Sequence, residues 1–155
     1  MIRTLQFTTY ITRPISEVYD HMADPHNLIG LQPLLIEMSP VQSTRVNGVI
    51  VQTYETIEAF RLGGYNVYRN RIRVRTTLTR PNEQIDSLVH SPGGVTLDVG
   101  YTFTPQAGAS QCGGTQLTEV MEINAPRLMA GFVVRQATLA QQAVMQRLKA
   151  RLEAA

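Results

Sequence analysis

The alternation of apolar and polar residues predicts extended strands over most of the chain. Over residues 2–12, Leu5, Phe7, Thr9 and Ile11 alternate with polar neighbours, a period of two that is typical of a half-buried strand. The same period returns later and predicts six further strands, at 36–46, 49–61, 65–79, 84–91, 95–104 and 115–124. Most connections between them are short, so neighbouring strands must pair antiparallel.

Helical spacing of apolar residues flanks this strand region. It predicts two short helices after the first strand, one following Pro14 and one following Asp24. A long helix is predicted from Pro126 to about Leu152, with Asn124 as its N-cap. A sheet of seven strands must twist and curl, and a long amphipathic helix can bury its concave face. The predicted fold class is therefore α+β, with a seven-stranded curved antiparallel sheet around a long C-terminal helix.

Composition places the chain among globular proteins. It has 155 residues, of which 43% are apolar and 17% charged, so residues 1–155 are expected to form one domain with a real core. A formal net charge of +2 gives no electrostatic case for nucleic acid. Cys112 is the one cysteine, which excludes an internal disulfide and favours a reducing compartment. With no signal peptide and no apolar stretch of about 18 residues expected, the predicted location is cytoplasmic.

Turn length fixes strand register, and register fixes the face to which each side chain points. A two-residue turn at 63–64 places Glu58 opposite Arg69 and Glu55 opposite Ile72. The predicted consequence is that Glu55 points toward the helix and Glu58 points away from it.

The next two turns give compatible registers. A two-residue turn at 81–82 places Val74 opposite Val89, and a three-residue turn at 92–94 places Val89 opposite Leu97. The residues predicted to line a cavity between sheet and helix are Glu55, Ile57, Tyr68, Asn70, Ile72, Ser87, Val89, Leu97, Val99, Tyr101, Glu119, Met121, Phe132 and Gln136. Each polar member could instead be a satisfied core group or a strand end in solvent. An unpartnered buried polar group costs about 1–3 kcal/mol, so several together indicate a ligand-sized cavity.

The order of elements and one local motif resemble a known superfamily. Residues 11–20 read Ile-Thr-Arg-Pro-Ile-Ser-Glu-Val-Tyr-Asp and residues 24–28 read Asp-Pro-His-Asn-Leu. This pattern resembles the START/Bet v 1-like (SRPBCC) superfamily, and more narrowly its polyketide cyclase/dehydrase and lipid-transport group. The resemblance covers essentially the whole chain and implies a helix-grip fold with a deep internal cavity. Members bind lipids, hormones, quinones or polyketides, and a few catalyse cyclisation, so fold analogy alone assigns no activity.

Three functions follow from these observations. The first is binding of a small hydrophobic or amphipathic molecule, such as a lipid or polyketide. The second is a polyketide cyclase or aromatase, in which Tyr68, Glu55, Tyr101 or Glu119 would shuttle protons; no catalytic residue can be assigned. The third is a partner protein that acts through its surface. An inward Glu55 or Glu119 would have its ionised form disfavoured, which suits acid–base chemistry, a hydrogen bond to a ligand hydroxyl, or a structural pair.

The remaining charged and metal-binding residue types indicate no further site. Arg69, Arg71, Arg73 and Arg75 occupy alternate positions of one strand. This stripe is predicted on the outer face, where solvation with cross-strand partners is favoured over contact with phosphates or anionic lipid. The three histidines lack metal-site spacing and no phosphate-binding loop occurs, so no metal and no cofactor are predicted. The oligomeric state is left open, with a dimer among the options.

Overall fold

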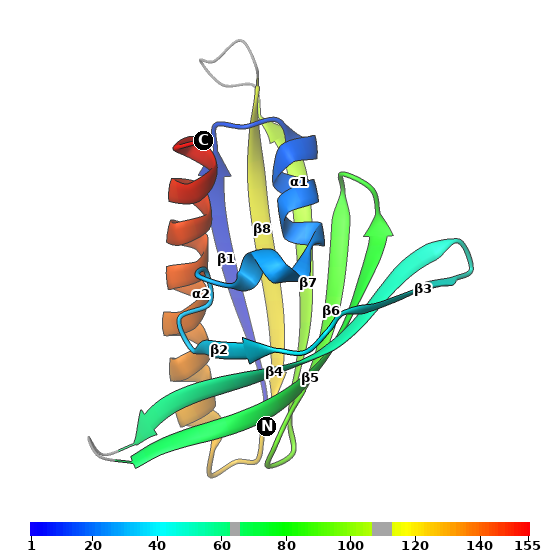
Figure 1. Cartoon of the computed structure of the whole chain (residues 1–155). Coiled ribbons are helices and arrows are strands. Elements are labelled where there is room, and N and C mark those ends of the chain that lie inside the picture. Colours follow the sequence, from blue (N-terminus) through cyan, green and yellow to red (C-terminus); the bar gives the residue numbers. More distant parts are fainter. Residues whose placement is uncertain (63–65, 107–112) are drawn as a thin grey trace.

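Eight strands form one antiparallel sheet that curves around a long helix (Figure 1). This computed structural model describes residues 1–62, 66–106 and 113–155. Along the chain the elements are β1 (Ile2–Ile11), α1 (Ile15–Ala23), the 3₁₀ helix η1 (Pro25–Leu28), β2 (Leu35–Met38), β3 (Gln42–Val46), β4 (Val49–Leu62), β5 (Asn66–Arg80), β6 (Gln84–Ser91), β7 (Val95–Gln106), β8 (Gly114–Asn124) and α2 (Ala130–Glu153). Cys112 lies outside the described residues.

The strands follow one another in space almost as they do in sequence. Their order is β1-β8-β7-β6-β5-β4-β2, and β3 pairs with a second stretch of β4. The one long-range pairing joins β1 to β8, with Ile2 opposite Asn124 and Ile11 opposite Thr115. The N-terminal amine of Met1 adds a hydrogen bond to the carbonyl of Ala125 at 2.9 Å. This pairing places β1 beside α2, which follows β8 directly.

The strand predicted at 36–46 is two strands, and the prediction of seven strands is therefore wrong by one. β2 and β3 both pair with β4, and residues 39–41, which include Pro40, belong to neither strand. Proline has no N–H group to give to a strand ladder. The Ser39 side chain continues the ladder instead, because the Glu55 N–H donates to Ser39 Oγ at 2.8 Å while the Ser39 N–H donates to the Glu55 carbonyl at 2.9 Å.

The long helix begins later than predicted. Residues 126–129 form a turn in which the N–H groups of Met129 and Ala130 both donate to the Pro126 carbonyl, and α2 begins at Ala130. Asn124 does not cap this helix, since it is still paired within β8. β8 therefore ends at Asn124, as the predicted strand did, and the turn at 126–129 separates it from α2.

The register between β4 and β5 differs by one residue from the prediction. Leu62 pairs with Asn66, so residues 63–65 separate the paired positions where a two-residue turn at 63–64 was expected; that turn lies outside the described residues. Glu58 consequently stands opposite Asn70. Because successive side chains of a strand point to opposite faces, this one-residue shift exchanges the inner and outer faces of β4.

The next hairpin keeps its predicted register for a different reason. Val74 pairs with Val89 as expected, although β5 ends opposite Gln84 at Arg80, which leaves three residues in the turn and not two. A β-bulge between Thr77 and Arg80 takes up the extra residue. No such bulge interrupts the described pairing of β4 with β5, so there the extra residue changes the faces.

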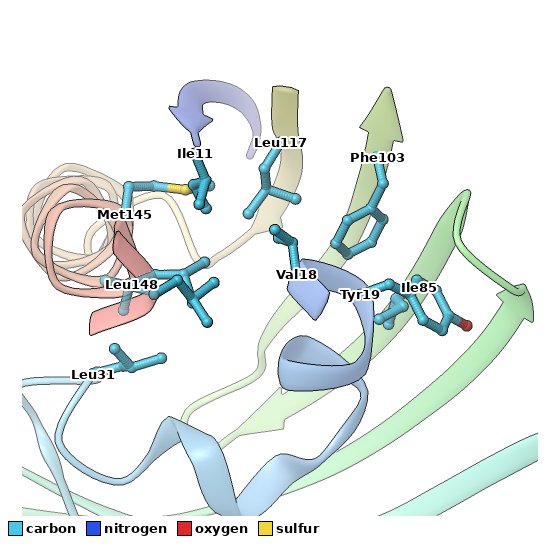
Figure 2. Packing of buried hydrophobic residues seen from close by; sticks show 11 residues of the cluster. Ile11, Val18, Tyr19, Leu31, Ile85, Phe103, Leu117, Met145 and Leu148 are labelled. Atoms are coloured by element: carbon cyan, nitrogen blue, oxygen red, sulfur yellow. The ribbon is translucent and has the colours of Figure 1, made fainter. Parts of the chain in front are cut away.

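Two buried clusters hold α2 against the sheet. One joins the C-terminal half of α2 to α1, and Figure 2 shows Leu148 of α2, Leu117 of β8 and Val18 of α1 pointing toward one another. The second cluster lies nearer the start of α2 and includes Ala130 of that helix. Tyr101 packs against both clusters. Side chains of both clusters also line a cavity.

Candidate functional site: an internal cavity

A cavity of about 240 Å³ lies between the sheet, α2 and the segment that contains η1. The sheet contributes side chains from β4 to β8, and α2 contributes residues from Phe132 to Val144. The segment between α1 and β2 supplies Met22, Pro25, Leu28, Gln32, Leu34 and Leu35. The volume is slightly below the roughly 300–1,000 Å³ of common ligand pockets, so the cavity suits a small molecule.

Most of the residues predicted to face the cavity do line its wall. They come from β5, β6, β7, β8 and α2, and they are Asn70, Ile72, Ser87, Val89, Leu97, Val99, Tyr101, Met121, Phe132 and Gln136. The registers of the hairpins that join β5, β6 and β7 decide most of these orientations. Their part in binding a ligand stays a prediction.

The prediction that Glu55 and Ile57 face the cavity is wrong. Both stand on the outer face of β4, opposite Arg73 and Arg71 respectively. The Glu55 carboxylate is about half exposed, and its Oε2 lies 3.5 Å from Arg71 Nη1. The physical reason is that three residues, and not two, separate the paired positions Leu62 and Asn66, and this removes Glu55 from any role inside the cavity.

Tyr68 does not line the cavity either. It has the same strand parity as Asn70 and Ile72, yet 46% of its surface is exposed. The ends of β4 and β5 near this residue extend past α2 in Figure 1. Tyr68 therefore has the correct face but lies beyond the part of the sheet that the helix covers.

Glu119 points to the inner face, as its parity on β8 predicted, but it lies behind the cavity wall. It is fully buried and stands opposite Tyr101, whose side chain does line the cavity. Burial raises the pKa of Glu119 to about 8, and the neighbouring Tyr101 hydroxyl opposes that rise. Among the described residues neither carboxyl oxygen has a hydrogen-bond partner of good geometry. Glu119 is therefore mostly protonated at neutral pH.

Sequence reasoning missed the inner face of β4. Tyr54, Thr56 and Glu58 line the cavity there. Burial raises the pKa of the Glu58 carboxyl to about 7. Alternation along β4 could not have revealed this, because both of its faces mix polar and apolar residues. The one signal was the length of the turn between β4 and β5, and the predicted turn was one residue too short.

One row of polar side chains on the wall is internally hydrogen-bonded. Thr76 Oγ1 and Ser87 Oγ, on paired strands, lie 2.8 Å apart. Tyr54 is bonded to Thr76, and this bond opposes the rise that burial causes in the pKa of Tyr54. These hydroxyl groups satisfy one another, so they need no ligand.

A second set of polar side chains on the same wall is unsatisfied. Within the part of the chain that the structure describes, the side chains of Glu58, Asn70 and Gln136 have no hydrogen-bond or ion-pair partner. Gln141, further along α2, also lines the cavity and has a buried Oε1 without a partner. Polar groups in this state are available to a bound molecule.

The outer face of β5 carries a row of arginine side chains. Arg69, Arg71, Arg73 and Arg75 are all exposed on the outer face of β5, and Ala59, not Glu58, stands opposite Arg69. The described residues contain no group of three or more His, Cys, Asp or Glu side chains that could hold a metal ion. None of the described helices is long and apolar enough to cross a membrane.

Comparison with protein families decides where the chain belongs. Residues 9–154 match the model of a domain of unknown function, DUF7053. The chain belongs to the DUF7053 family. A search of curated proteins finds no match for this DUF7053 protein.

Solved structures resemble this DUF7053 protein in fold. TTHA0849 from Thermus thermophilus has a TM-score of 0.73 at 14% identity, covering 98% of each chain. The Zhui aromatase/cyclase from Streptomyces sp. R1128 has a TM-score of 0.70 at 16% identity, covering 97% of this chain and 96% of that one. A START superfamily protein from Mycobacterium smegmatis has a TM-score of 0.70 at 12% identity, covering 97% of each. The predicted START-like, SRPBCC fold is confirmed.

Proposed function

We propose that this DUF7053 protein binds a small, mostly apolar molecule in the cavity between its sheet and α2. The supporting observation is an internal space with a largely aliphatic wall, formed by residues such as Ile72, Val89 and Val99. Protein interiors are normally close-packed. Here small side chains of α2, Ala137 and Ala140, face the space where larger ones would fill it. A bound molecule would restore those contacts.

Filling the cavity tests this proposal. Ala137→Phe should weaken binding of 1-octanol by about tenfold or more, equivalent to about 1.4 kcal/mol, because the ring occupies ligand space. Ala150→Phe is the matched control, since Ala150 lies on the exposed side of the same helix. Isothermal titration calorimetry measures both. Equal affinity of wild type and Ala137→Phe would show that octanol binds elsewhere.

An enzyme of the cyclase/dehydrase type is a second candidate, favoured by Glu58. A carboxyl group that faces a cavity with a pKa of about 7 can both take and give a proton near neutral pH. The similarity in fold to an aromatase/cyclase is compatible with this reading. The wild-type protein should then speed exchange of the α-protons of 2-octanone in D₂O, followed by NMR, and Glu58→Gln should not. Equal rates for the two proteins would leave binding as the function.

Three narrower tests accompany the proposal. If the protein carries a lipid, it should move a fluorescent lipid from donor to acceptor vesicles, which a lipid-transfer assay measures. A cytoplasmic location is tested by cell fractionation. A surface-acting role would persist in Ala137→Phe, whereas a cavity-based role would be lost.

A further inference from the structure

The two sets of polar side chains on the cavity wall differ in whether their hydrogen-bonding groups have partners. Tyr54, Thr76 and Ser87 are bonded to one another. Glu58 and Asn70 have no partner among the residues that the structure describes. The first set is therefore structural, and the second leaves hydrogen-bonding capacity facing the cavity.

The unsatisfied pair sits at one end of the cavity. Glu58 and Asn70 are direct cross-strand partners on the inner face of β4 and β5. Tyr54 stands four residues earlier on β4, which is about 13 Å at the usual strand rise of about 3.3 Å per residue. Between these positions lies the pair of Thr56 on β4 and Ile72 on β5, and Val74 stands opposite Tyr54. Along β5, Ile72 and Val74 thus form an apolar stretch between Asn70 at the Glu58 end and Thr76 of the hydroxyl row.

A carboxyl group in this position is costly to the fold. Burial alone raises the pKa of Glu58 to about 7, because no charge or hydrogen bond compensates its lost hydration. A glutamine or leucine of similar size would avoid this cost. A ligand group that donates a hydrogen bond to the carboxylate would offset it, since charge-assisted hydrogen bonds are about twice as strong as neutral ones.

The described part of the wall favours a neutral or basic ligand over an acidic one. No lysine, arginine or histidine lines the cavity within the described residues, and Glu58 is its one carboxyl group. A carboxylate or phosphate on the ligand would find no cation there and would face Glu58. A hydroxyl or amine would find an acceptor in Glu58 and an amide in Asn70.

We propose that Glu58, with Asn70 beside it, receives the polar head of the cavity ligand, and that this head is a hydroxyl or an amine rather than an acid. The inference rests on the proposed function, because it names the class of molecule that the same cavity takes. The ligand is then a short amphipathic alcohol or amine whose apolar body lies along Ile72 and Val74.

Three probes with one chain and different heads test the assignment: 1-octanol, octylamine and octanoate, titrated calorimetrically at pH 8. Wild-type protein should bind octanol and octylamine at least about tenfold more tightly than octanoate. Glu58→Gln should weaken the binding of octylamine about tenfold, and it should bind octanoate more tightly than the wild type does. Glu55→Gln is the matched control, since Glu55 lies on the outer face of the same strand, and it should behave as wild type.

The outcomes separate the two proposals. Equal affinity of wild type for all three probes overturns the head-group assignment and leaves cavity binding intact. Binding of none of them overturns the proposed function as well. If Glu58→Gln does not fold, the wild-type preference among the three heads still decides, because it needs no variant.

Discussion

Two carboxyl groups on the inner side of the sheet, the partly buried Glu58 and the fully buried Glu119, have no ionic partner among the described residues. Burial raises the pKa of both, so both are at least partly protonated at neutral pH. Their positions differ. Glu58 lines the cavity, whereas Glu119 is fully buried beside Tyr101 and does not line it.

Glu119→Gln should stabilise the protein above neutral pH. The folded-state pKa of about 8 exceeds the ordinary value of 4.5. The folded state therefore binds more protons than the unfolded state, and stability falls as pH rises from about 4.5 through 8. Removing the group should raise the free energy of unfolding at pH 9 by several kcal/mol, on the order of 1.4 kcal/mol for each pKa unit. Urea denaturation at pH 5 and pH 9 measures the difference.

A neighbour on the same strand supplies the control for this prediction. Glu122 is exposed, so Glu122→Gln should change stability little at either pH. A Glu119→Gln protein that is no more stable than wild type at pH 9 would mean that Glu119 is hydrated or ion-paired when ionised.

At the scale of elements, α2 both packs against the sheet and α1 and forms part of the cavity wall. Its residues from Phe132 to Val144 contribute to the cavity wall, and its C-terminal part packs in the cluster that includes α1 and the end of β1. Leu148, in that part, has 0% of its surface exposed. The first turns of α2 pack against the second cluster, so the helix is held to the sheet on both sides of the cavity wall.

Leu148→Ala should destabilise the protein by about 2–5 kcal/mol, because it removes buried methyl groups and leaves a hole beside Val18 and Leu117. Thermal and urea unfolding measure the loss. Leu139→Ala on the same helix is the control, since Leu139 is 55% exposed, and its effect should stay within about 0.5 kcal/mol. Equal losses in the two variants would contradict the described packing of α2.

For the molecule as a whole, members of both buried clusters line the cavity, and Tyr101 packs against both clusters. A ligand that fills this space contacts side chains of both clusters together with α2. Binding and global stability should therefore be linked, since a molecule that binds only the folded state stabilises it by mass action.

1-Octanol at 100 times its dissociation constant should raise the free energy of unfolding by about 2.7 kcal/mol, and differential scanning calorimetry would record a higher Tm. The rise should disappear in Ala137→Phe and persist in Ala150→Phe. A Tm rise of equal size in Ala137→Phe would place the alcohol outside the cavity.

Hydrophobic periodicity and turn residues, which are local properties, determined most of the strands, the helices and the inner faces of β5 to β8, and the resemblance of this order and of residues 11–20 and 24–28 to a known superfamily indicated the START-like fold. Tertiary structure decided the rest. The inner face of β4 depended on one additional residue at 63–65, which exchanged Glu55 for Glu58. Tyr68 is exposed because β5 extends beyond α2, and Glu119 is fully buried beside its strand partner Tyr101, which lines the cavity where Glu119 does not. Strand parity specifies a face, but how far a helix covers that face and which side chain stands in front depend on packing between distant segments.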